Sequence, residues 1–260
     1  MPDKLQYRID LKYIGTSFNG WQTQLDGGSV QDHLEAAMEK VLSEKIKLIG
    51  ASRTDSGVHA EHQVASFLSS NELDCGKLRA SLNALLPESV GVESIAQVSR
   101  DFHPIRSSTA KVYCYQIWNQ PYRDPFYQPF SWRISSKLDL SKMTEAAQHF
   151  IGTHDFSSFC AADSSAKTKE RRIIEVKVSS YENGLVQCWF VGEGFLKQMV
   201  RSMTGTLVDV GLGKRDVESI PSLIKAKDRT KSGKTAPAQG LCLKRVVYET
   251  LEGKSLLGSQ

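Results

Sequence analysis

Residues 5–13 alternate strictly between apolar and polar side chains, and this pattern constrains the fold more than any other feature of the sequence. Successive side chains of an extended segment point to opposite sides, so strict alternation predicts a strand with one buried face. The apolar positions are Leu5, Tyr7, Ile9, Leu11 and Tyr13. A chain that begins this way is expected to build a sheet with other elements packed against its apolar face.

A helix is expected to follow this strand. Ser29 and Asp32 have the spacing of a capping box, in which each side chain satisfies a backbone amide of the first turn. Apolar residues then recur at helical spacing, and the helix is expected to end at about Ser43. These apolar residues are Leu34, Met38, Val41 and Leu42.

The rest of the first half continues the alternation of strands and helices. Strands are expected at 45–49, at 63–68 and after Val90. Before the last of these, Asp74 is expected to cap a helix that ends ahead of Pro87. The order strand, helix, strand, strand, helix, strand is that of the split βαβ or ferredoxin-like fold.

A hairpin is the clearest feature of the second half. The dipeptide Asn183-Gly184 stands between expected strands at 173–179 and 185–191, and Asn-Gly is the strongest turn signal for a two-residue hairpin loop. Two more strands are expected at 110–118 and 241–248.

Two helices are expected beside these strands. Ser141 precedes one that carries Met143, Ala147, Phe150 and Ile151. An apolar stripe over 196–210 predicts the other, with Gly211 as its C-terminal cap. We therefore expect an α+β protein with two ferredoxin-like or RRM-like lobes, residues 1–105 and 106–260, with largely antiparallel sheets and a central cleft as the active site.

Composition excludes several classes of protein. Hydrophobic residues make up 40% of the 260 and charged residues 24%, as in globular proteins, and no run of about eighteen apolar residues appears. The five cysteines are widely spaced without a C-x-x-C pair, and His59 and His62 lack the H-E-x-x-H pattern, so neither disulfides nor a metal site are expected. The segment MPDKLQYRID has no signal-peptide core, which favours a cytoplasmic location.

Two basic clusters permit a polyanionic partner. The net charge is +4, and positive side chains gather in 167–172 and in 225–234 without a comparable acidic block. For either cluster alone, a solvated loop is the more ordinary interpretation. The S-G-K-T of 232–235 lacks the earlier glycine of a phosphate-binding loop, because position 228 is Asp228, and no dinucleotide-binding pattern is complete.

The stretch A-S-R-T-D-S-G-V-H-A, residues 51–60, holds a single carboxylate in a polar setting. In an extended backbone Arg53 and Asp55 leave on the same face, about 7 Å apart at Cα, so the guanidinium would keep the carboxylate charged and available as a nucleophile or base. Gly57 permits a tight turn beside it. Residue types alone favour a structural loop over a catalytic one, and Asp55 lacks the second carboxylate that a glycosidase uses.

This stretch closely resembles the G-R-T-D-A-G-V-H-A signature of tRNA pseudouridine synthases of the TruA family. Seven further blocks resemble the family in family order, so that the likeness covers nearly the whole chain. They lie at 10–24, 29–37, 82–87, 101–115, 152–159, 194–207 and 235–243. Ser52 and Ser56 depart from the family's usual glycine and alanine but leave Arg53, Asp55 and Gly57 in register.

The resemblance implies an enzyme that isomerises uridines 38, 39 and 40 in the anticodon stem-loop of tRNA, as a homodimer without cofactor or metal. It implies that Asp55 is the nucleophile and that Arg53 holds the target base out of the helix. Tyr113 would stack on the uracil and take part in removing the C5 proton, and Arg201 would be the basic residue that pairs with the aspartate. A membrane is not implied.

Two other functions remain open at this point. A catalytically silent RNA-binding protein with two RRM-like lobes would use the same basic surface and would not need Asp55. A hydrolase of the same fold would cleave the glycosidic bond and release free uracil.

Overall fold

The computed structural model describes residues 4–250 and 255–257. The described chain forms two compact units. Unit 1 takes residues 4–109 and 243–250, and unit 2 takes 110–242 and 255–257. Residues 243–250 are grouped with unit 1, and strand β10 (Leu241–Val247) neighbours β3 of that unit.

Unit 1 is organised around the alternating segment, which forms strand β1 (Leu5–Tyr13) as expected. It runs antiparallel to β3 (His59–Ser69) on one side and to β4 (Val90–Gln97) on the other, and the two-residue β2 (Ile49–Gly50) also pairs with β3. The predicted apolar face is confirmed, since Tyr7, Ile9 and Leu11 are fully buried.

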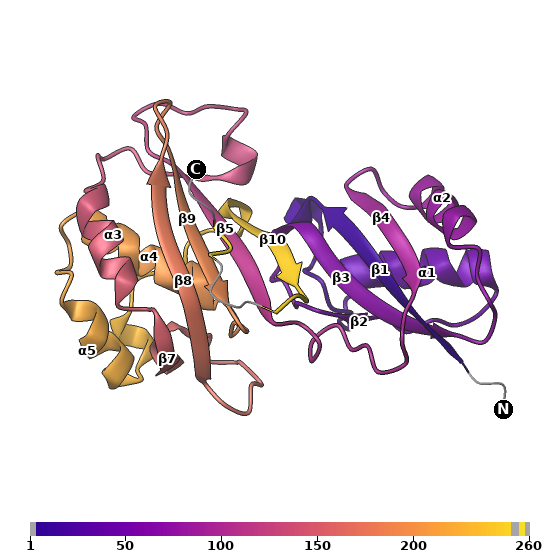
Figure 1. The fold of residues 1–260 in the computed structure, drawn as a ribbon. Helices are drawn as coiled ribbons and strands as arrows, with labels where there is room; N and C mark the ends of the chain where they lie inside the picture. Colours follow the sequence, from indigo (N-terminus) through magenta and orange to yellow (C-terminus); the bar gives the residue numbers. More distant parts are fainter. Residues whose placement is uncertain (1–3, 251–254, 258–260) are drawn as a thin grey trace. The chain divides into compact units, whose positions relative to one another are not determined.

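Two helices pack on this sheet (Figure 1). Helix α1 (Val30–Leu42) begins with the predicted capping box, in which Asp32 N donates to Ser29 Oγ at 3.1 Å and Ser29 N donates to Asp32 Oδ2 at 2.9 Å. Helix α2 (Cys75–Leu85) begins at Asp74, whose carboxylate accepts from Lys77 N. The strand and helix order of the first half is therefore confirmed.

Unit 2 holds the strand order β5, β9, β8, β7, all antiparallel, with β6 running parallel to β5. The predicted hairpin is present: β8 and β9 are joined by a tight turn in which Gly184 has φ +88°. The strand bounds are β5 (Ala110–Trp118), β6 (Trp132–Arg133), β7 (Gly152–Asp155), β8 (Glu170–Ser180) and β9 (Leu185–Gly192).

Three helices belong to unit 2: α3 (Leu140–Gln148), α4 (Met199–Gly211) and α5 (Ser219–Ala226). Helix α4 packs on β5, and α3 packs on both α4 and β8 (Figure 1). Short 3-10 turns lie at Gly15–Ser17, Gln128–Phe130, Ser157–Phe159, Arg229–Lys231 and Ala238–Gly240. The described residues thus form a mixed α/β fold whose strand pairs are mostly antiparallel.

The expected strand at 45–49 is wrong for four of its five residues. Two side chains of α1 bind the backbone of Leu48. Glu35 Oε1 accepts from Leu48 N at 2.8 Å, and Gln31 Nε2 donates to Leu48 O at 3.2 Å. Because these bonds replace strand pairing, β2 begins only at Ile49.

Two helix ends also differ from expectation. Helix α3 is capped by Asp139, so that Ser141 lies inside the helix rather than before it, and the helix ends before Phe150 and Ile151. Gly211 is the last helical residue of α4 and not its cap; the left-handed residue is Gly213, with φ +68°. Gly211 instead lets α4 approach α3 closely, since a Cβ there would lie 2.7 Å from Met143 Sδ of α3.

Candidate functional site

The loop that carries the predicted nucleophile joins β2 to β3 in unit 1. Its side chains alternate in exposure: Thr54 is buried, whereas Arg53 is exposed and Asp55 is half-buried. Gly57 has φ +80°, so the predicted tight turn after Asp55 is confirmed. The turn is closed by Val58 N, which donates to Asp55 O at 3.1 Å.

The segment after β1 holds the backbone of this loop. Trp21 N donates to Thr54 O at 3.1 Å, and Gly57 N donates to Phe18 O at 3.4 Å. The two bonds lie on either side of Asp55 in the sequence. The backbone that presents the carboxylate is therefore fixed before any substrate arrives, which is how an enzyme limits the reorganisation needed during reaction.

Buried side chains hold the same loop from beneath. The hydroxyls of Tyr13 and Thr54 are 2.8 Å apart. Gln63 bridges the backbone of Ser52, accepting from its N at 3.2 Å and donating to its O at 2.7 Å. Ser52 stands where the family usually has glycine, and this backbone pairing accommodates it without a special conformation.

Two glycines of the 10–24 block allow its backbone to pack directly against the loop that carries Asp55. A Cβ on Gly15 would lie 1.9 Å from Val58 O, and one on Gly20 would lie 2.6 Å from Thr54 O. Backbone packs directly on backbone at both points, so larger residues do not fit. His59 has a structural role here as well, because it is buried and its Nδ1 accepts from Gly15 N at 3.1 Å.

Tyr113 lies on β5 in unit 2, with 5% of its surface exposed. Its ring meets that of Phe195 edge to face, with 5.1 Å between the centroids. It pairs in register with Phe190 of β9. Lys111 and Tyr115 share its face of the strand, since they are two residues away on either side.

Arg201 lies on α4, half-buried, and is anchored to the segment before β10. Its Nε donates to Ala236 O at 2.8 Å, and Ala236 N donates to Arg201 O at 3.1 Å. The Arg201 charge also acts on the phenol of Tyr115. Burial raises the pKa of this phenol well above the usual range, and the positive charge of Arg201 opposes that rise. Its hydroxyl donates to Pro237 O at 2.7 Å.

The S-G-K-T stretch is part of the same anchor. A Cβ on Gly205 of α4 would lie 1.8 Å from Lys234 O, and Gly233 N donates to Thr206 Oγ1 at 2.9 Å. The stretch therefore packs on a helix rather than around a phosphate. Each unit thus carries two of the four predicted residues: Asp55 and Arg53 in unit 1, Tyr113 and Arg201 in unit 2.

Several basic side chains of the two clusters have structural partners. Lys227 pairs with Asp155 at 2.9 Å. Arg229 donates to Ser232, Gly233 and Thr235, and burial lowers the pKa of its guanidinium. The 225–234 cluster is therefore in part a folded corner.

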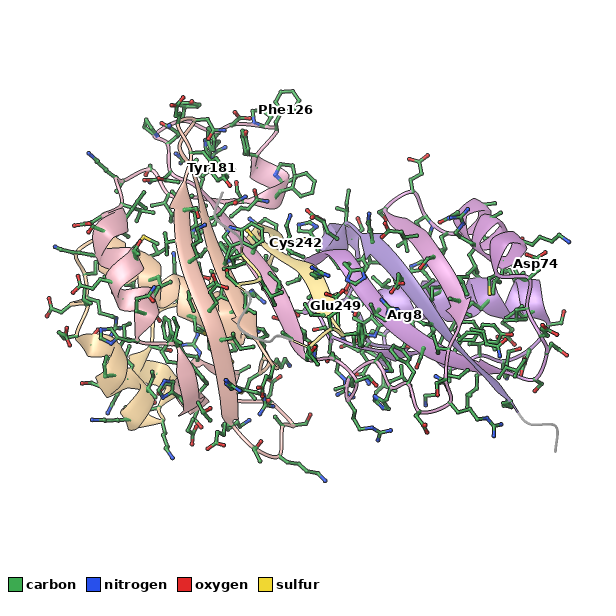
Figure 2. The ribbon with its side chains drawn as sticks, viewed as in Figure 1. Arg8, Asp74, Phe126, Tyr181, Cys242 and Glu249 are labelled. Carbon is green, nitrogen blue, oxygen red and sulfur yellow. The ribbon has the colours of Figure 1, made fainter. Side chains whose placement is uncertain are left out.

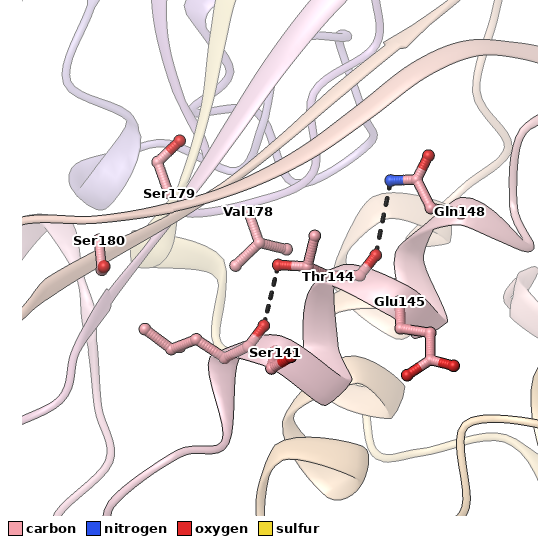
Figure 3. Close-up of a pocket in the computed structure, with 8 residues that line it drawn as sticks. Ser141, Thr144, Glu145, Gln148, Val178, Ser179 and Ser180 are labelled. Carbon is pink, nitrogen blue, oxygen red and sulfur yellow. Dashed lines mark hydrogen bonds between the residues drawn. The ribbon is translucent and has the colours of Figure 1, made fainter.

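Two hollows of unit 2 are lined by none of the four predicted residues. One, of about 530 Å³, lies between α3 and β8, where Thr144 Oγ1 donates to Leu140 O and Gln148 Nε2 donates to Thr144 O (Figure 3). Another, of about 420 Å³, is lined by Trp118, Trp132, Arg123 and Arg133 among others. Phe126, 89% exposed, projects from the loop between β5 and β6 (Figure 2).

No helix in residues 4–250 or 255–257 is long and apolar enough to cross a membrane. Within the same residues, no group of three His, Cys, Asp or Glu side chains is placed to hold a metal ion.

Comparison with known proteins gives consistent matches. The sequence profile of a family described as "tRNA pseudouridine synthase" matches residues 11–105 and 146–249. The chain is 44% identical to tRNA pseudouridine synthase A of Pelobacter propionicus, over 93% of this chain and 98% of that one. It is 40% identical to the enzyme of that name from Acetivibrio thermocellus, with the same coverage. Among solved structures, a chain of an archaeal box H/ACA sRNP complex aligns with TM-score 0.36 and 12% identity, over 78% of this chain and 43% of that one.

Proposed function

The chain belongs to the tRNA pseudouridine synthase family and is an isomerase that acts on tRNA, and we propose that its substrates are uridines 38, 39 and 40 of the anticodon stem-loop. Membership of a family of enzymes argues against the catalytically silent RNA-binding protein. We also propose a homodimer located in the cytoplasm, and two lobes of ferredoxin-like topology.

The reaction requires few groups from the protein. The bond between uracil N1 and ribose C1′ breaks, the base turns, and a bond forms between C5 and C1′, while C5 loses a proton and N1 gains one. No water is added and no electrons are transferred. A single carboxylate suffices to engage the nucleotide while the base is detached, which explains a lone aspartate better than hydrolysis does.

Asp55 is proposed as that nucleophile. The observation that supports it best is the way its loop is held, by Trp21 and Phe18 from one side and by Tyr13 and Gln63 from the other. These bonds fix the backbone on both sides of Asp55, and the Asp55 side chain is half-buried.

The other proposed roles follow from the side chains available. The target base lies in a stacked RNA and must be turned out, at a cost of a few kcal/mol, and then held. The ring of Tyr113 is proposed to stack on the uracil and its hydroxyl to take part in removal of the C5 proton. Arg53, exposed beside the nucleophile, is proposed to hold the base out of the helix, and Arg201 to supply positive charge for the carboxylate.

The test is site-specific detection of pseudouridine by carbodiimide labelling of unmodified tRNA after incubation with each variant. Asp55→Asn and Asp55→Ala are expected to leave positions 38–40 unlabelled, whereas Asp101→Asn, an exposed matched control, is expected to label as the native protein does. Normal labelling with both Asp55 variants would exclude this nucleophile. Release of free uracil by the native protein would identify a hydrolase instead.

The proposed homodimer is tested separately by light scattering at a concentration at which the enzyme turns over. Twice the mass of one chain is expected. A monomer under those conditions contradicts the proposal without affecting the assignment of Asp55.

A further inference from the structure

Lys111 is a buried cation with no counter-ion among the described residues. Only 8% of the residue is exposed, and within residues 4–250 and 255–257 no side-chain acceptor or carboxylate is bonded to its ammonium. Its charged neighbour is another cation, Arg171, and burial together with that charge lowers the pKa of Lys111 to about 8. Two adjacent positive charges at a largely buried position are costly unless an anion joins them.

The sheet register places the two cations on the same face of the sheet. Lys111 of β5 pairs with Gly192 of β9, and Gly192 pairs with Ile173 of β8. Arg171 is two residues before Ile173 and therefore on the same face. Gly192 has no side chain, and the space over it is taken by Ile173 Cδ1 and Phe195 Cζ, which a Cβ there would approach to 3.0 and 3.1 Å.

Arg171 is oriented by its own loop. Its Nη1 donates to Thr168 O at 3.1 Å and to Thr168 Oγ1 at 3.3 Å. A Cβ on Gly194 would lie 3.8 Å from its Cδ and Nε, so the chain passes close beneath the guanidinium. The carboxylate of Glu193, beside Gly194, is paired with Arg172 at 3.2 Å. Glu170 and Arg172, the neighbours of Arg171 along β8, face the other side of the strand.

The ammonium is not fully enclosed. The fully buried side-chain atoms that lack a partner in the described residues are Ser202 Oγ and Arg215 Nε. Lys111 Nζ, which has no partner among the described residues, is not one of them, so a small part of its surface is open. Tyr113 follows two residues later on the same face, with Phe195 against it.

We propose that Lys111 and Arg171 form a binding site for a backbone phosphate of tRNA, next to the nucleotide whose base contacts Tyr113. A phosphate between two cations gains charge-assisted hydrogen bonds from both and neutralises their repulsion. Gly194 of the G-E-G-F sequence of 192–195 lies against Arg171, where its missing side chain leaves room beside the guanidinium. The identity of the RNA segment rests on the proposed function, whereas the phosphate contact does not.

The experiment measures tRNA binding as a function of KCl concentration, by filter retention, in an Asp55→Asn background in which turnover is not expected. For Lys111→Met and for Arg171→Gln, affinity is expected to fall about tenfold. The slope of log K against log[KCl] is expected to become shallower by about 1, as for the loss of one phosphate contact. The two changes together are expected to cost little more than either alone, because they share one phosphate.

Two controls separate this site from general charge and from folding. Arg172→Gln removes the same charge one residue away on the opposite face, and it is expected to leave the slope nearly unchanged. Lys111→Arg is expected to restore most of the affinity. Lys111→Met is expected to melt at or above the temperature of the parent protein, because it removes an uncompensated buried charge.

Unchanged affinity and slope in Lys111→Met would overturn the proposal. So would a lowered melting temperature together with failure of Lys111→Arg to restore binding, since Lys111 would then be structural. If the native protein yields no pseudouridine at 38–40 but Lys111→Met loses the salt-dependent contact, the proposed substrate positions fail and the phosphate site stands. If the native protein forms pseudouridine at 38–40 and Lys111→Met leaves the slope of log K against log[KCl] unchanged, the proposed substrate positions stand and the phosphate site fails.

Discussion

Replacing Lys111 by methionine is expected to make the protein more stable at neutral pH, which is unusual for a buried position. Methionine keeps the length and the apolar stem of lysine and removes the charge. The buried ammonium has Arg171 as its charged neighbour and no carboxylate partner within the described part of the chain. The folded state therefore holds a charge that the unfolded chain would give to water.

The magnitude follows from the pKa. Burial and Arg171 lower it from the ordinary 10.5 to about 8, which corresponds to about 3 kcal/mol at about 1.4 kcal/mol per pKa unit. Imperfect packing of the methionine is expected to offset about 1 kcal/mol of this. The free energy of unfolding of Lys111→Met at pH 7 is thus expected to exceed that of the native protein by about 2 kcal/mol.

The extra stability of Lys111→Met over the native protein is expected to shrink at alkaline pH. Below pH 8 Lys111 is charged in both states, so the full penalty is present. Between pH 8 and 10.5 the folded state releases its proton first, and the native protein gains stability relative to the variant. By pH 10 the penalty on the native protein is expected to fall from about 3 to about 1 kcal/mol.

Urea unfolding of both proteins at pH 7 and pH 10 measures this difference, and any general alkaline destabilisation cancels between them. Equal slopes with urea are needed for the comparison. A variant less stable than the native protein at pH 7, or a difference that does not change with pH, would refute the reasoning.

Three further changes address the frame of the site. Thr54→Val removes the hydroxyl that lies 2.8 Å from that of Tyr13. Thermal melting is expected to show a loss of about 1–2 kcal/mol of stability, and single-turnover kinetics are expected to show a larger fall in kcat than in tRNA affinity. Gly205→Ala places a Cβ 1.8 Å from Lys234 O and is expected to lower Tm by several degrees. An unchanged Tm would contradict this packing argument. Tyr113→Phe keeps the ring and is expected to retain tRNA binding while slowing C5 proton loss at least tenfold, and equal rates would remove the hydroxyl from the mechanism.

The parts of the fold that the sequence predicted are those with local causes. Strand β1 follows from its own alternation, α1 from its capping box, and the β8–β9 hairpin from Asn183-Gly184. The strand expected at 45–49 failed because the competing partners, Gln31 and Glu35, come from another element. Such competition is set by tertiary structure and leaves no local pattern.

The same limit applies to the site. Residue types at 51–60 did not separate a catalytic loop from a structural one, because the bonds that hold the loop come from Trp21, Tyr13 and Gln63. Lys111 stands out in the sequence because it is in phase with Tyr113 and Tyr115, on the face of β5 where a lysine is least expected. Its burial beside Arg171 depends on the register of three strands, which the sequence does not specify.

The central claim is that Asp55 drives isomerisation of tRNA uridines. It is tested most directly by tritium release from unmodified tRNA labelled at uridine C5, because each pseudouridine formed frees one C5 hydrogen. The native protein and Asp101→Asn are expected to release tritium in step with pseudouridine formation, and Asp55→Asn is expected to release none while still binding tRNA. Tritium release by Asp55→Asn at the native rate would contradict the account.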